Sequence, residues 1–397
     1  MKTPSRSNPI FIYNALYHYH MKILITLTYY YPYISGLSIY TKNLAEELVK
    51  KGFNINILTS QHEKNLSILD YINGVILIRV PYSFKLHKGF IMFSYPIYVI
   101  NQLLLCDIVI IHLPQAESIV TVFLAKILRK KIYCIYQCEL KLADGLINKI
   151  IEIILILINI IVCFLSDKII TNTNDFAVNS TVLKFFLKKI EYIIPPIISP
   201  RISKITVRKI SNKFFKKKYV IGFLGRISSE KGLNYLLKAV PYFIKKIGNN
   251  FTILISGPNN LNGEEEYNLY IKKLIKKFEK NITYIGALQN KEVGSFFSVI
   301  DVLVLPSINS TESFGMVQVE AMYCGVPVVA TNIPGVRVPI QLSGMGMLIK
   351  TNSTISIVES VVNILKNKHK FIYSRQKIKN IFSLKKTINK FHQILYL

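Results

Sequence analysis

The chain has 397 residues, of which 51% are hydrophobic, 50 are Lys or Arg, 22 are Asp or Glu and five are Cys. This apolar content excludes an intrinsically disordered chain, the sparse cysteines exclude a disulfide scaffold, and the length predicts two domains. The formal net charge of +28 would suit nucleic acid, anionic lipid or an anionic substrate, although a composition rich in Lys, Ile and Asn accounts for part of it. No zinc-ligand spacing and no aromatic-interleaved basic motif is present, so we expect neither zinc nor a nucleic-acid partner.

Residues 1–20 form an N-terminal extension before the first predicted strand. Their apolar run is interrupted by Asn14, His18 and His20, and no small-residue cleavage site follows. A secretory signal peptide needs an uninterrupted run and such a site, so we do not expect one here.

Apolar strands alternate with helical patterns through the first half of the chain. Strands are predicted at 22–30, 54–60, 75–82, 107–115, 131–138 and 167–173. The segment 36–52 places apolar residues on one helical face and ends in glycine, which predicts a helix. Continuous apolar strands with intervening helices are typical of a parallel sheet that is covered on both faces.

The segment 146–165 is strongly apolar and predicts a long helix. Four polar residues interrupt it: Asn148, Lys149, Glu152 and Asn159. A membrane-spanning helix needs about 20 apolar residues, and the cleanest run, 153–165, is shorter than that. We therefore expect a buried helix or a helix at a membrane surface rather than a span.

A proline-rich and then strongly basic stretch separates two alternating halves. We place a basic linker at 199–218, between an N-terminal domain at 21–198 and a C-terminal domain at 219–375, with a final helix at 376–397. Strands of the second half are predicted at 219–226, 251–257, 282–288, 301–307 and 326–332. The fold class is therefore α/β with two doubly wound domains, and we expect ligands in the cleft between the carboxyl ends of both sheets.

Two glutamates, Glu312 and Glu320, stand in the most informative segment of the chain, 306–331. The intervening Ser-Phe-Gly predicts a helix that begins near Gly315, with Glu312 in the loop before it and Glu320 one to two turns inside. The N–H groups from Phe314 to Val317, Gly315 and Met316 included, would be free to bind an anion. Two carboxylates beside an anion site suit a nucleotide sugar; the alternative is an acid that only favours the helix dipole.

Two cations and a glycine stand at other predicted strand ends. Arg226 and Lys231 follow a strand that ends at Gly225, and together they could neutralise a diphosphate, although each could also be an ordinary surface cation. Gly36 opens a helix after the first strand and would let a phosphate approach the backbone. The dinucleotide fingerprint is incomplete there, so NAD is not expected.

These residues together resemble the family 4 retaining glycosyltransferases of GT-B fold, from Met21 to about Ser383. The motifs that carry the resemblance are GRISSEKG, DVLVLPS, YIGAL and ESFGMVQVEAMYCGVPVVAT, the last of which matches the E-x7-E signature of the family. The resemblance implies two Rossmann-like domains, with the acceptor bound by the N-terminal domain and the nucleotide-sugar donor by the C-terminal domain. It also implies hexosyl transfer with retention of configuration and without a bound metal or other cofactor.

The resemblance assigns roles to individual residues. Arg226 and Lys231 would hold the donor diphosphate, Glu312 the transferred sugar and Glu320 the ribose. The further donor-binding residues it implies are Gly36, Gly225, Gly286, Phe314, Gly315, Met316 and Val317. Glu312, Arg226 and Lys231 would act in catalysis, through stabilisation of the leaving diphosphate.

The acceptor half departs from the family pattern. Gln137 stands where a histidine is expected and Glu139 where an aspartate is common. Glutamine can hydrogen-bond a sugar but cannot titrate, so an impaired nucleotide-sugar-binding protein is the alternative function. His112, at another strand end, is a further candidate on the acceptor side, or else a structural histidine under the sheet.

The basic C-terminal stretch completes the expectations. By resemblance it returns to the N-terminal domain, and its amphipathic character would also suit an anionic membrane surface. We expect a cytoplasmic enzyme, in part at the inner face of a membrane. Its donor would be a UDP-, GDP- or ADP-sugar and its acceptor a saccharide or a lipid-linked sugar, in surface polysaccharide or glycolipid synthesis.

Overall fold

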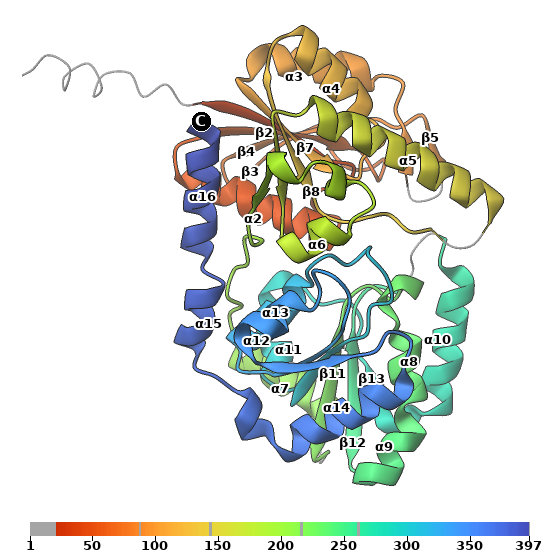
Figure 1. The fold of residues 1–397 in the computed structure, drawn as a ribbon. Helices are drawn as coiled ribbons and strands as arrows, with labels where there is room; N and C mark the ends of the chain where they lie inside the picture. Colours follow the sequence, from red (N-terminus) through yellow and green to blue (C-terminus); the bar gives the residue numbers. More distant parts are fainter. Residues whose placement is uncertain (1–20, 87–88, 143–144, 215–216, 260–262, 397) are drawn as a thin grey trace, which may run out of the picture.

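Two parallel β-sheets form the centres of two stacked lobes in the computed structural model (Figure 1). The structure describes residues 21–86, 89–142, 145–214, 217–259 and 263–396. The extension predicted at 1–20 therefore lies outside the described residues.

The N-terminal sheet has eight strands within the described residues, in the order β10-β9-β8-β7-β1-β2-β4-β3. Their bounds are β1 Lys22–Thr26, β2 Asn54–Ser60, β3 Leu69–Ile72, β4 Val75–Val80, β7 Ile108–Leu113, β8 Lys131–Tyr136, β9 Lys168–Thr171 and β10 Ile190–Tyr192. All neighbours pair in parallel except β3 and β4. A short hairpin of β5 (Phe84–Leu86) and β6 (Gly89–Ile91) lies apart from this sheet.

The C-terminal sheet has six strands within the described residues, all of them parallel, in the order β13-β12-β11-β14-β15-β16. Their bounds are β11 Tyr219–Leu224, β12 Phe251–Ser256, β13 Ile282–Tyr284, β14 Val302–Leu305, β15 Val328–Thr331 and β16 Gly346–Ile349. This arrangement confirms the predicted α/β fold class, with two doubly wound, Rossmann-like domains.

Helices cover both faces of the N-terminal sheet. One face carries α3 (Tyr95–Leu105), α4 (Ser118–Ile127) and α5 (Leu146–Leu165). The other carries α2 (Gly36–Lys50) and the C-terminal α16 (Leu384–Tyr396). Central strands are therefore apolar along their whole length, and every residue of β7 is buried.

The C-terminal sheet is covered in the same way. One face carries α8 (Leu233–Lys238), α9 (Val240–Ile247), α10 (Glu265–Lys277) and α14 (Thr354–Lys366). The other carries α7 (Lys204–Ser211), α11 (Val293–Phe297), α12 (Met316–Tyr323), α13 (Val338–Ser343) and α15 (Arg375–Ile381). Helix α7 lies inside the segment expected to be a basic linker, and its Ile210 is buried in the domain core. Much of that segment is thus part of the C-terminal domain.

The C-terminal helix α16 packs on the N-terminal domain (Figure 1). Ile388, Phe391 and Leu395 are buried against α2 and the sheet, and Tyr133 donates a hydrogen bond of 3.1 Å to the carbonyl oxygen of Ile394. The expectation of an amphipathic lipid-binding surface at this stretch is therefore wrong for its apolar side. That side completes the core of the first domain.

The strand orders place the ligand-binding crevices. In each sheet one strand, β1 or β11, has its sequence neighbour β2 or β12 on one side and a later strand, β7 or β14, on the other. Ligands of open α/β sheets bind outside the carboxyl ends of the strands at such switch points. The loops that follow β1, β7, β11 and β14 therefore border these crevices.

Candidate functional site

Two helix N-termini face each other between the domains. Gly36 begins α2 in the N-terminal domain, and Met316 begins α12 in the C-terminal domain. A Cβ atom added at Gly36 would lie 4.0 Å from Met316 Cε, in ordinary contact. The first N–H groups of a helix lack intrahelical acceptors and carry partial positive charge, so two such ends together favour an anion.

Glu312 lies in the loop before α12, as predicted, and its carboxylate is held from two sides. One oxygen accepts a hydrogen bond of 3.0 Å from the Gly315 N–H, and the other lies 2.5 Å from Lys231 Nζ. The expectation that the Gly315 N–H is free for an anion is therefore wrong, because the nearby carboxylate takes it. The N–H groups of Met316 and Val317, in the first turn, still point out of the helix start.

Close packing of two loops positions Lys231. It ends the short helix Ser229–Lys231 and is followed by Gly232, which has a left-handed backbone with φ of 65°. A Cβ atom at Gly232 would lie 2.1 Å from the carbonyl oxygen of Pro306, so only glycine permits this approach of the β11 and β14 loops. The approach brings Lys231 to Glu312.

Arg226 follows β11 and Gly225 and reaches into the space between the domains. Its guanidinium lies 3.0 Å from the carboxylate of Glu230 and beside the hydroxyl of Tyr33, which belongs to the N-terminal domain. Burial opposes the positive charge, but Glu230 and Tyr33 outweigh it and raise the pKa of Arg226. Arg226 is thus a permanent cation at the domain boundary.

Glu320 lies in the second turn of α12, as predicted. No hydrogen bond or ion pair joins its side chain to the described residues, and burial raises the pKa of its carboxyl to about 7. A half-buried carboxyl group of this kind accepts a proton near neutrality. A ligand hydroxyl that donates to it would favour the ionised form.

Three glycines gather the loops at the ends of β11, β12 and β13. A Cβ atom at Gly257 would lie 1.8 Å from the carbonyl oxygen of Gly225, and the Gly257 N–H donates to the Gly286 carbonyl over 3.0 Å. Gly286 has φ of 80° and no atom within 4 Å of an added Cβ. The backbone at Gly286, in the predicted nucleobase loop, is therefore open.

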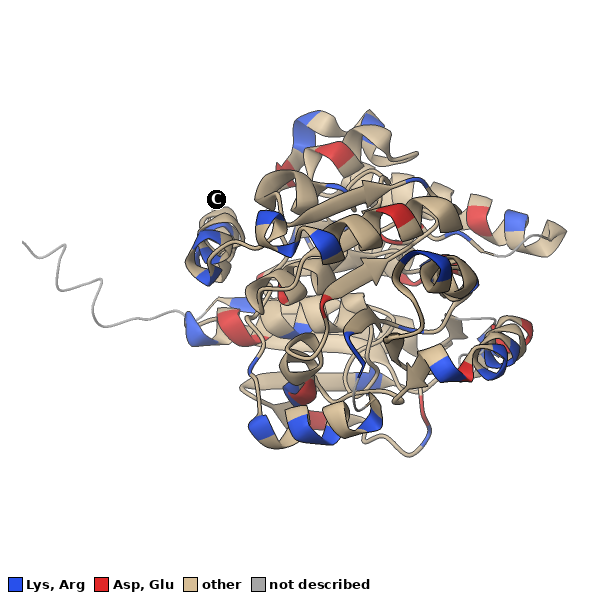
Figure 2. Ribbon diagram, turned by 90° about the horizontal axis from the view of Figure 1, so that it is seen from below, with Lys and Arg blue, Asp and Glu red and all other residues tan. Residues whose placement is uncertain are grey.

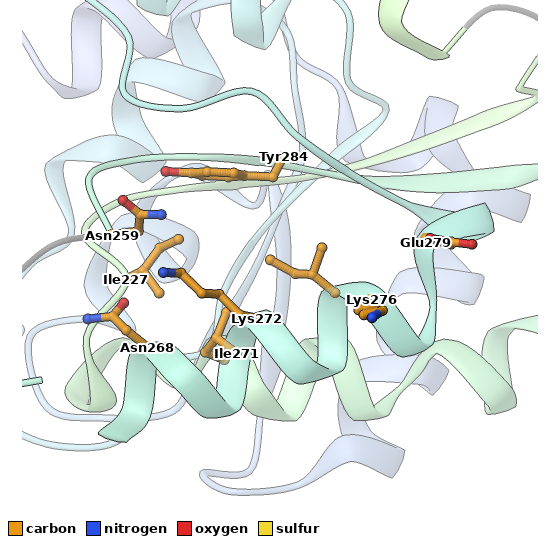
Figure 3. Close-up of a pocket in the computed structure, with 9 residues that line it drawn as sticks. Ile227, Asn259, Asn268, Ile271, Lys272, Lys276, Glu279 and Tyr284 are labelled. Carbon is orange, nitrogen blue, oxygen red and sulfur yellow. The ribbon is translucent and has the colours of Figure 1, made fainter. Parts of the chain in front are cut away.

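A pocket of about 340 Å³ lies beside these loops, between α10 and the end of β13 (Figure 3). It is lined by Ile227, Asn259, Asn268, Ile271, Lys272, Ile275, Lys276, Glu279 and Tyr284. None of the predicted donor residues is among them, so the pocket adjoins the predicted site rather than containing it.

The three predicted residues of the acceptor side do not share one environment. His112 is fully buried and accepts a hydrogen bond of 3.2 Å from the Gln137 side-chain amide. Burial lowers the pKa of His112 to about 3, so the ring is neutral. Of the two expectations for His112, the structural histidine is therefore confirmed and the acceptor contact is not, because the residue lies on a strand that is covered on both faces. Its ring holds the Gln137 side chain in place.

Glu139 holds the chain rather than facing a ligand. One of its carboxylate oxygens accepts hydrogen bonds from the Ser180 hydroxyl and from the N–H and hydroxyl of Thr181. Its own N–H donates to the Ser310 carbonyl across the domain boundary, over 3.2 Å. Ser310 belongs to the loop that carries Glu312, so Glu139 fixes the position of that loop.

The segment around Gln137 lies directly beside the Glu312 loop. The Ser313 hydroxyl donates a hydrogen bond to the Gln137 carbonyl and accepts one of 3.2 Å from Asn172. Burial raises the pKa of the Cys138 thiol to about 12, and the neighbouring Glu312 carboxylate adds to this. The structure therefore joins Gln137, Arg226, Lys231 and Glu312 in one region.

Sequence reasoning missed three residues that border this region. The rings of Tyr29 and Tyr33 are stacked with centroids 4.3 Å apart, and Tyr33 contacts Arg226. Glu117, at the start of α4, has a buried Oε2 without a hydrogen-bond partner, and burial raises its pKa to about 7. The available signals were the Tyr-rich run after the first strand and an acid directly after the strand at 107–115.

A metal site is not apparent in the described parts of the chain. No group of three or more His, Cys, Asp or Glu side chains lies together there in a way that could hold an ion. Positive charge at the site comes instead from Arg226, Lys231 and the two helix starts.

Comparison with known proteins identifies the C-terminal half. Residues 205–381 match the family described as glycosyl transferases group 1. An uncharacterized 41.2 kDa protein in the cps region of Klebsiella pneumoniae is 34% identical over 151 residues, which cover 37% of this chain and 37% of that protein. An uncharacterized glycosyltransferase of Methanocaldococcus jannaschii is 28% identical over 366 residues, which cover 87% of this chain and 89% of the relative. At identities of 34–36% the aligned segments span only 28–37% of the relatives' own lengths.

A solved structure extends the likeness to both domains. The HepE protein of Anabaena in complex with UDP-glucose matches with a TM-score of 0.73 at 14% identity, over 95% of this chain and 100% of that chain. So low an identity supports the fold alone, and the strand orders described above agree with it. Residues 205–381 therefore match the group 1 glycosyltransferase family, and the chain as a whole has the GT-B fold.

Proposed function

We propose that the chain is a retaining glycosyltransferase of family 4 that moves a hexose from a nucleotide sugar to a saccharide or lipid-linked acceptor. The observation that carries the proposal is the meeting of two helix starts, at Gly36 and Met316, beside Arg226 and the Lys231–Glu312 pair. This arrangement concentrates positive charge where a diphosphate would lie and sets a carboxylate next to it.

The donor would bind mainly to the C-terminal domain. Arg226 and the α12 start would take the diphosphate, and Lys231 would exchange part of its interaction with Glu312 for a phosphate oxygen. Glu312 would then accept hydroxyl hydrogen bonds from the sugar, and Glu320 would accept them from the ribose. The open backbone at Gly286 would face the base, and the UDP-glucose held by HepE supports UDP among the UDP-, GDP- and ADP-sugars.

Transfer would proceed on one face of the sugar. The bond from the anomeric carbon to the phosphate oxygen breaks, the acceptor hydroxyl oxygen bonds to the same face of that carbon, and its proton passes to the departing phosphate oxygen. Arg226, Lys231 and the helix starts stabilise the charge that develops on the diphosphate. Because these groups supply the positive charge, we expect no metal requirement.

The acceptor would approach from the N-terminal domain. The Gln137 amide is oriented by His112 and could hydrogen-bond an acceptor hydroxyl, while the stacked rings of Tyr29 and Tyr33 offer a surface for a sugar ring. The relative in the Klebsiella cps region supports surface polysaccharide or glycolipid synthesis as the setting. The enzyme would then act in the cytoplasm, at the inner face of the membrane.

The second candidate function is a nucleotide-sugar-binding protein without transfer activity. The observation that favours it is the chemistry of the acceptor side, where Gln137 cannot titrate and His112 is neutral and buried. Such a protein would keep every donor contact and lose only the reaction.

The test begins with thermal unfolding of the whole chain in UDP-, GDP- and ADP-glucose. A ligand at 100 times its Kd stabilises the native state by about 2.7 kcal/mol, which is a readily measured shift in Tm. Transfer to saccharide acceptors is then compared between the unchanged chain and Glu312→Ala, with Glu359→Ala on the outer helix α14 as control. Loss of transfer in Glu312→Ala alone supports the proposal. Stabilisation without transfer supports the second candidate, and the absence of any shift contradicts both.

A further inference from the structure

Helix α5 presents most of its apolar side chains to solvent. It is 20 residues long, its most apolar window has a mean hydropathy of 2.5, and only 17% of that window is buried. Its exposed large apolar residues are Leu146, Ile147, Ile150, Ile153, Ile154, Leu157, Ile161 and Phe164. Of the two expectations for 146–165, a buried helix or a helix at a membrane surface, the first is therefore wrong for most of the helix. Only its second half packs on the core, where Asn159, Val162 and Cys163 are buried.

Neighbouring helices extend this apolar surface. Helices α3, α4 and α5 pack in a row on one face of the N-terminal sheet, so their outer sides share one direction. Phe123 and Ile127 of α4 are exposed, as are Ile97 and Leu104 of α3. Soluble monomers rarely expose contiguous apolar patches of this kind unless the patch binds something.

Cations border the C-terminal end of α5. Lys189 Nζ donates to the Phe164 carbonyl over 2.7 Å and lies 5.6 Å from the centroid of its ring. Lys184 and Lys188, on the same connection, are exposed beside exposed Phe185. Helix α5 itself carries only Lys149 and Glu152, so it projects as a nearly uncharged rod in the charge-coloured view (Figure 2).

The helix cannot cross a membrane without breaking the sheet. It connects β8 to β9, which are neighbours in parallel register, with Tyr133 opposite Lys168 and Cys134 opposite Ile169. The strands before and after α5 therefore belong to the same sheet, and the C-terminal turns of the helix stay packed on that sheet. The rest of the helix projects beyond the domain toward its N-terminal end, so its outer side is available (Figure 1).

We infer that the outer face of α3, α4 and α5 docks on an anionic lipid bilayer, with α5 lying in the plane of the interface. The apolar stripe would enter the upper acyl region, and Lys184, Lys188 and Lys189 would meet lipid phosphates. A second copy of the chain is a poorer occupant, because two molecules of charge +28 repel each other while an anionic surface attracts each one. The inference extends the membrane location given in the proposed function by naming the surface that binds lipid, and it is independent of the transfer reaction.

The test is flotation of the full chain with two kinds of vesicle, one of phosphatidylcholine alone and one that also contains about 30% phosphatidylglycerol. The second kind has a negative surface that attracts basic segments. The test variant is Ile150→Gln, Ile154→Gln and Leu157→Gln, whose parent side chains are 50%, 50% and 54% exposed. The matched control is Leu269→Gln, Leu342→Gln and Ile355→Gln in the C-terminal domain, 59%, 50% and 60% exposed. We expect the chain and the control to float with anionic vesicles, and the partition coefficient of the test variant to fall at least tenfold.

Two further measurements separate the alternatives. Lys184→Gln with Lys188→Gln should weaken binding to anionic vesicles severalfold and leave the Tm unchanged, because both lysines are exposed. Equal flotation of the test variant and the unchanged chain would overturn the inference, and so would equal binding to neutral and anionic vesicles. If the unchanged chain sedimented as a dimer and did not float, and the test variant sedimented as a monomer, the partner of this surface would be a second copy of the chain. UDP-glucose binding by every variant reports separately on the proposed function.

Discussion

The two sides of the interdomain region are built on different principles. On the C-terminal side, Arg226, Lys231 and Glu312 follow strands β11 and β14 within short segments of the chain. On the N-terminal side, Gly36, Gln137 and the tyrosines come from distant loops and are held by buried partners such as His112. Recognition of a diphosphate needs the same charges in every donor, whereas recognition of an acceptor depends on shape. Local sequence therefore reveals the first side much better than the second.

The largest effect should follow from removal of a cation on the C-terminal side. Lys231→Ala removes a charge that would stabilise the leaving diphosphate, by about 3 kcal/mol if it acts like a lost oxyanion donor, which is over a hundredfold in kcat/KM. Steady-state transfer kinetics measure this, with Lys245→Ala on the outer helix α9 as control. Equal activity of both variants would remove Lys231 from the mechanism.

The glycines at the two helix starts, Gly36 and Gly315, should respond differently to the same substitution. Gly315→Ala places a side chain at φ of 73°, with its Cβ 2.6 Å from Leu305 Cδ2, and a left-handed non-glycine residue alone costs about 1–2 kcal/mol of unfolding free energy. Gly36→Ala meets only an ordinary contact at 4.0 Å and should leave stability unchanged. Urea denaturation of both variants tests this difference, and equal destabilisation would contradict it.

A change on the N-terminal side should affect the acceptor alone. Gln137→Ala removes an amide that would orient the acceptor hydroxyl, and loss of about 1.4 kcal/mol would lower kcat/KM for the acceptor tenfold. The Kd for UDP-glucose should stay within about twofold of the unchanged chain, because Gln137 lies outside the donor contacts. A large rise in the donor Kd would place Gln137 on the other side of the region.

An effect of similar size is expected in the pH dependence of donor binding. Burial raises the pKa of Glu320 to about 7, so the carboxyl is mostly protonated at pH 6 and mostly ionised at pH 8. Ribose hydroxyls would donate to the ionised form, so UDP-glucose should bind about tenfold more tightly at pH 8 than at pH 6. Calorimetric titration measures this, and Glu320→Gln should abolish the dependence. A Kd that varies equally in both proteins would assign the effect to another group.

Much of the C-terminal side followed from local sequence. The helix start near Gly315, the place of Glu312 in the loop before it and the place of Glu320 inside the helix were all predicted. What failed was the assignment of the Gly315 N–H to a ligand, since the carboxylate three residues earlier already accepts it. Spacing alone does not show that a side chain before a helix accepts a hydrogen bond from the N–H group that a ligand would otherwise take.

On the N-terminal side, the sequence predicted which loops border the site but not how far their residues are buried. His112 lies near the end of an apolar strand and Gln137 directly follows another, and nothing in their local pattern shows that His112 is fully buried. The difference arises because β7 is an interior strand of the sheet, so its last residues are covered by α2 on one face and by helix α4 on the other.

The sequence by itself determined the alternation of strands and helices, the two domains and the cations and acids at the strand ends, because these depend on short-range periodicity and capping. Only the tertiary structure decided that Gly36 faces Met316, that Lys231 pairs with Glu312, and that α16 is covered while α5 is not. Each of these outcomes is a contact, or a missing contact, between segments far apart in the chain. The apolar faces of α5 and α16 have similar sequence patterns but differ in burial, because burial depends on which neighbour the fold brings to each face.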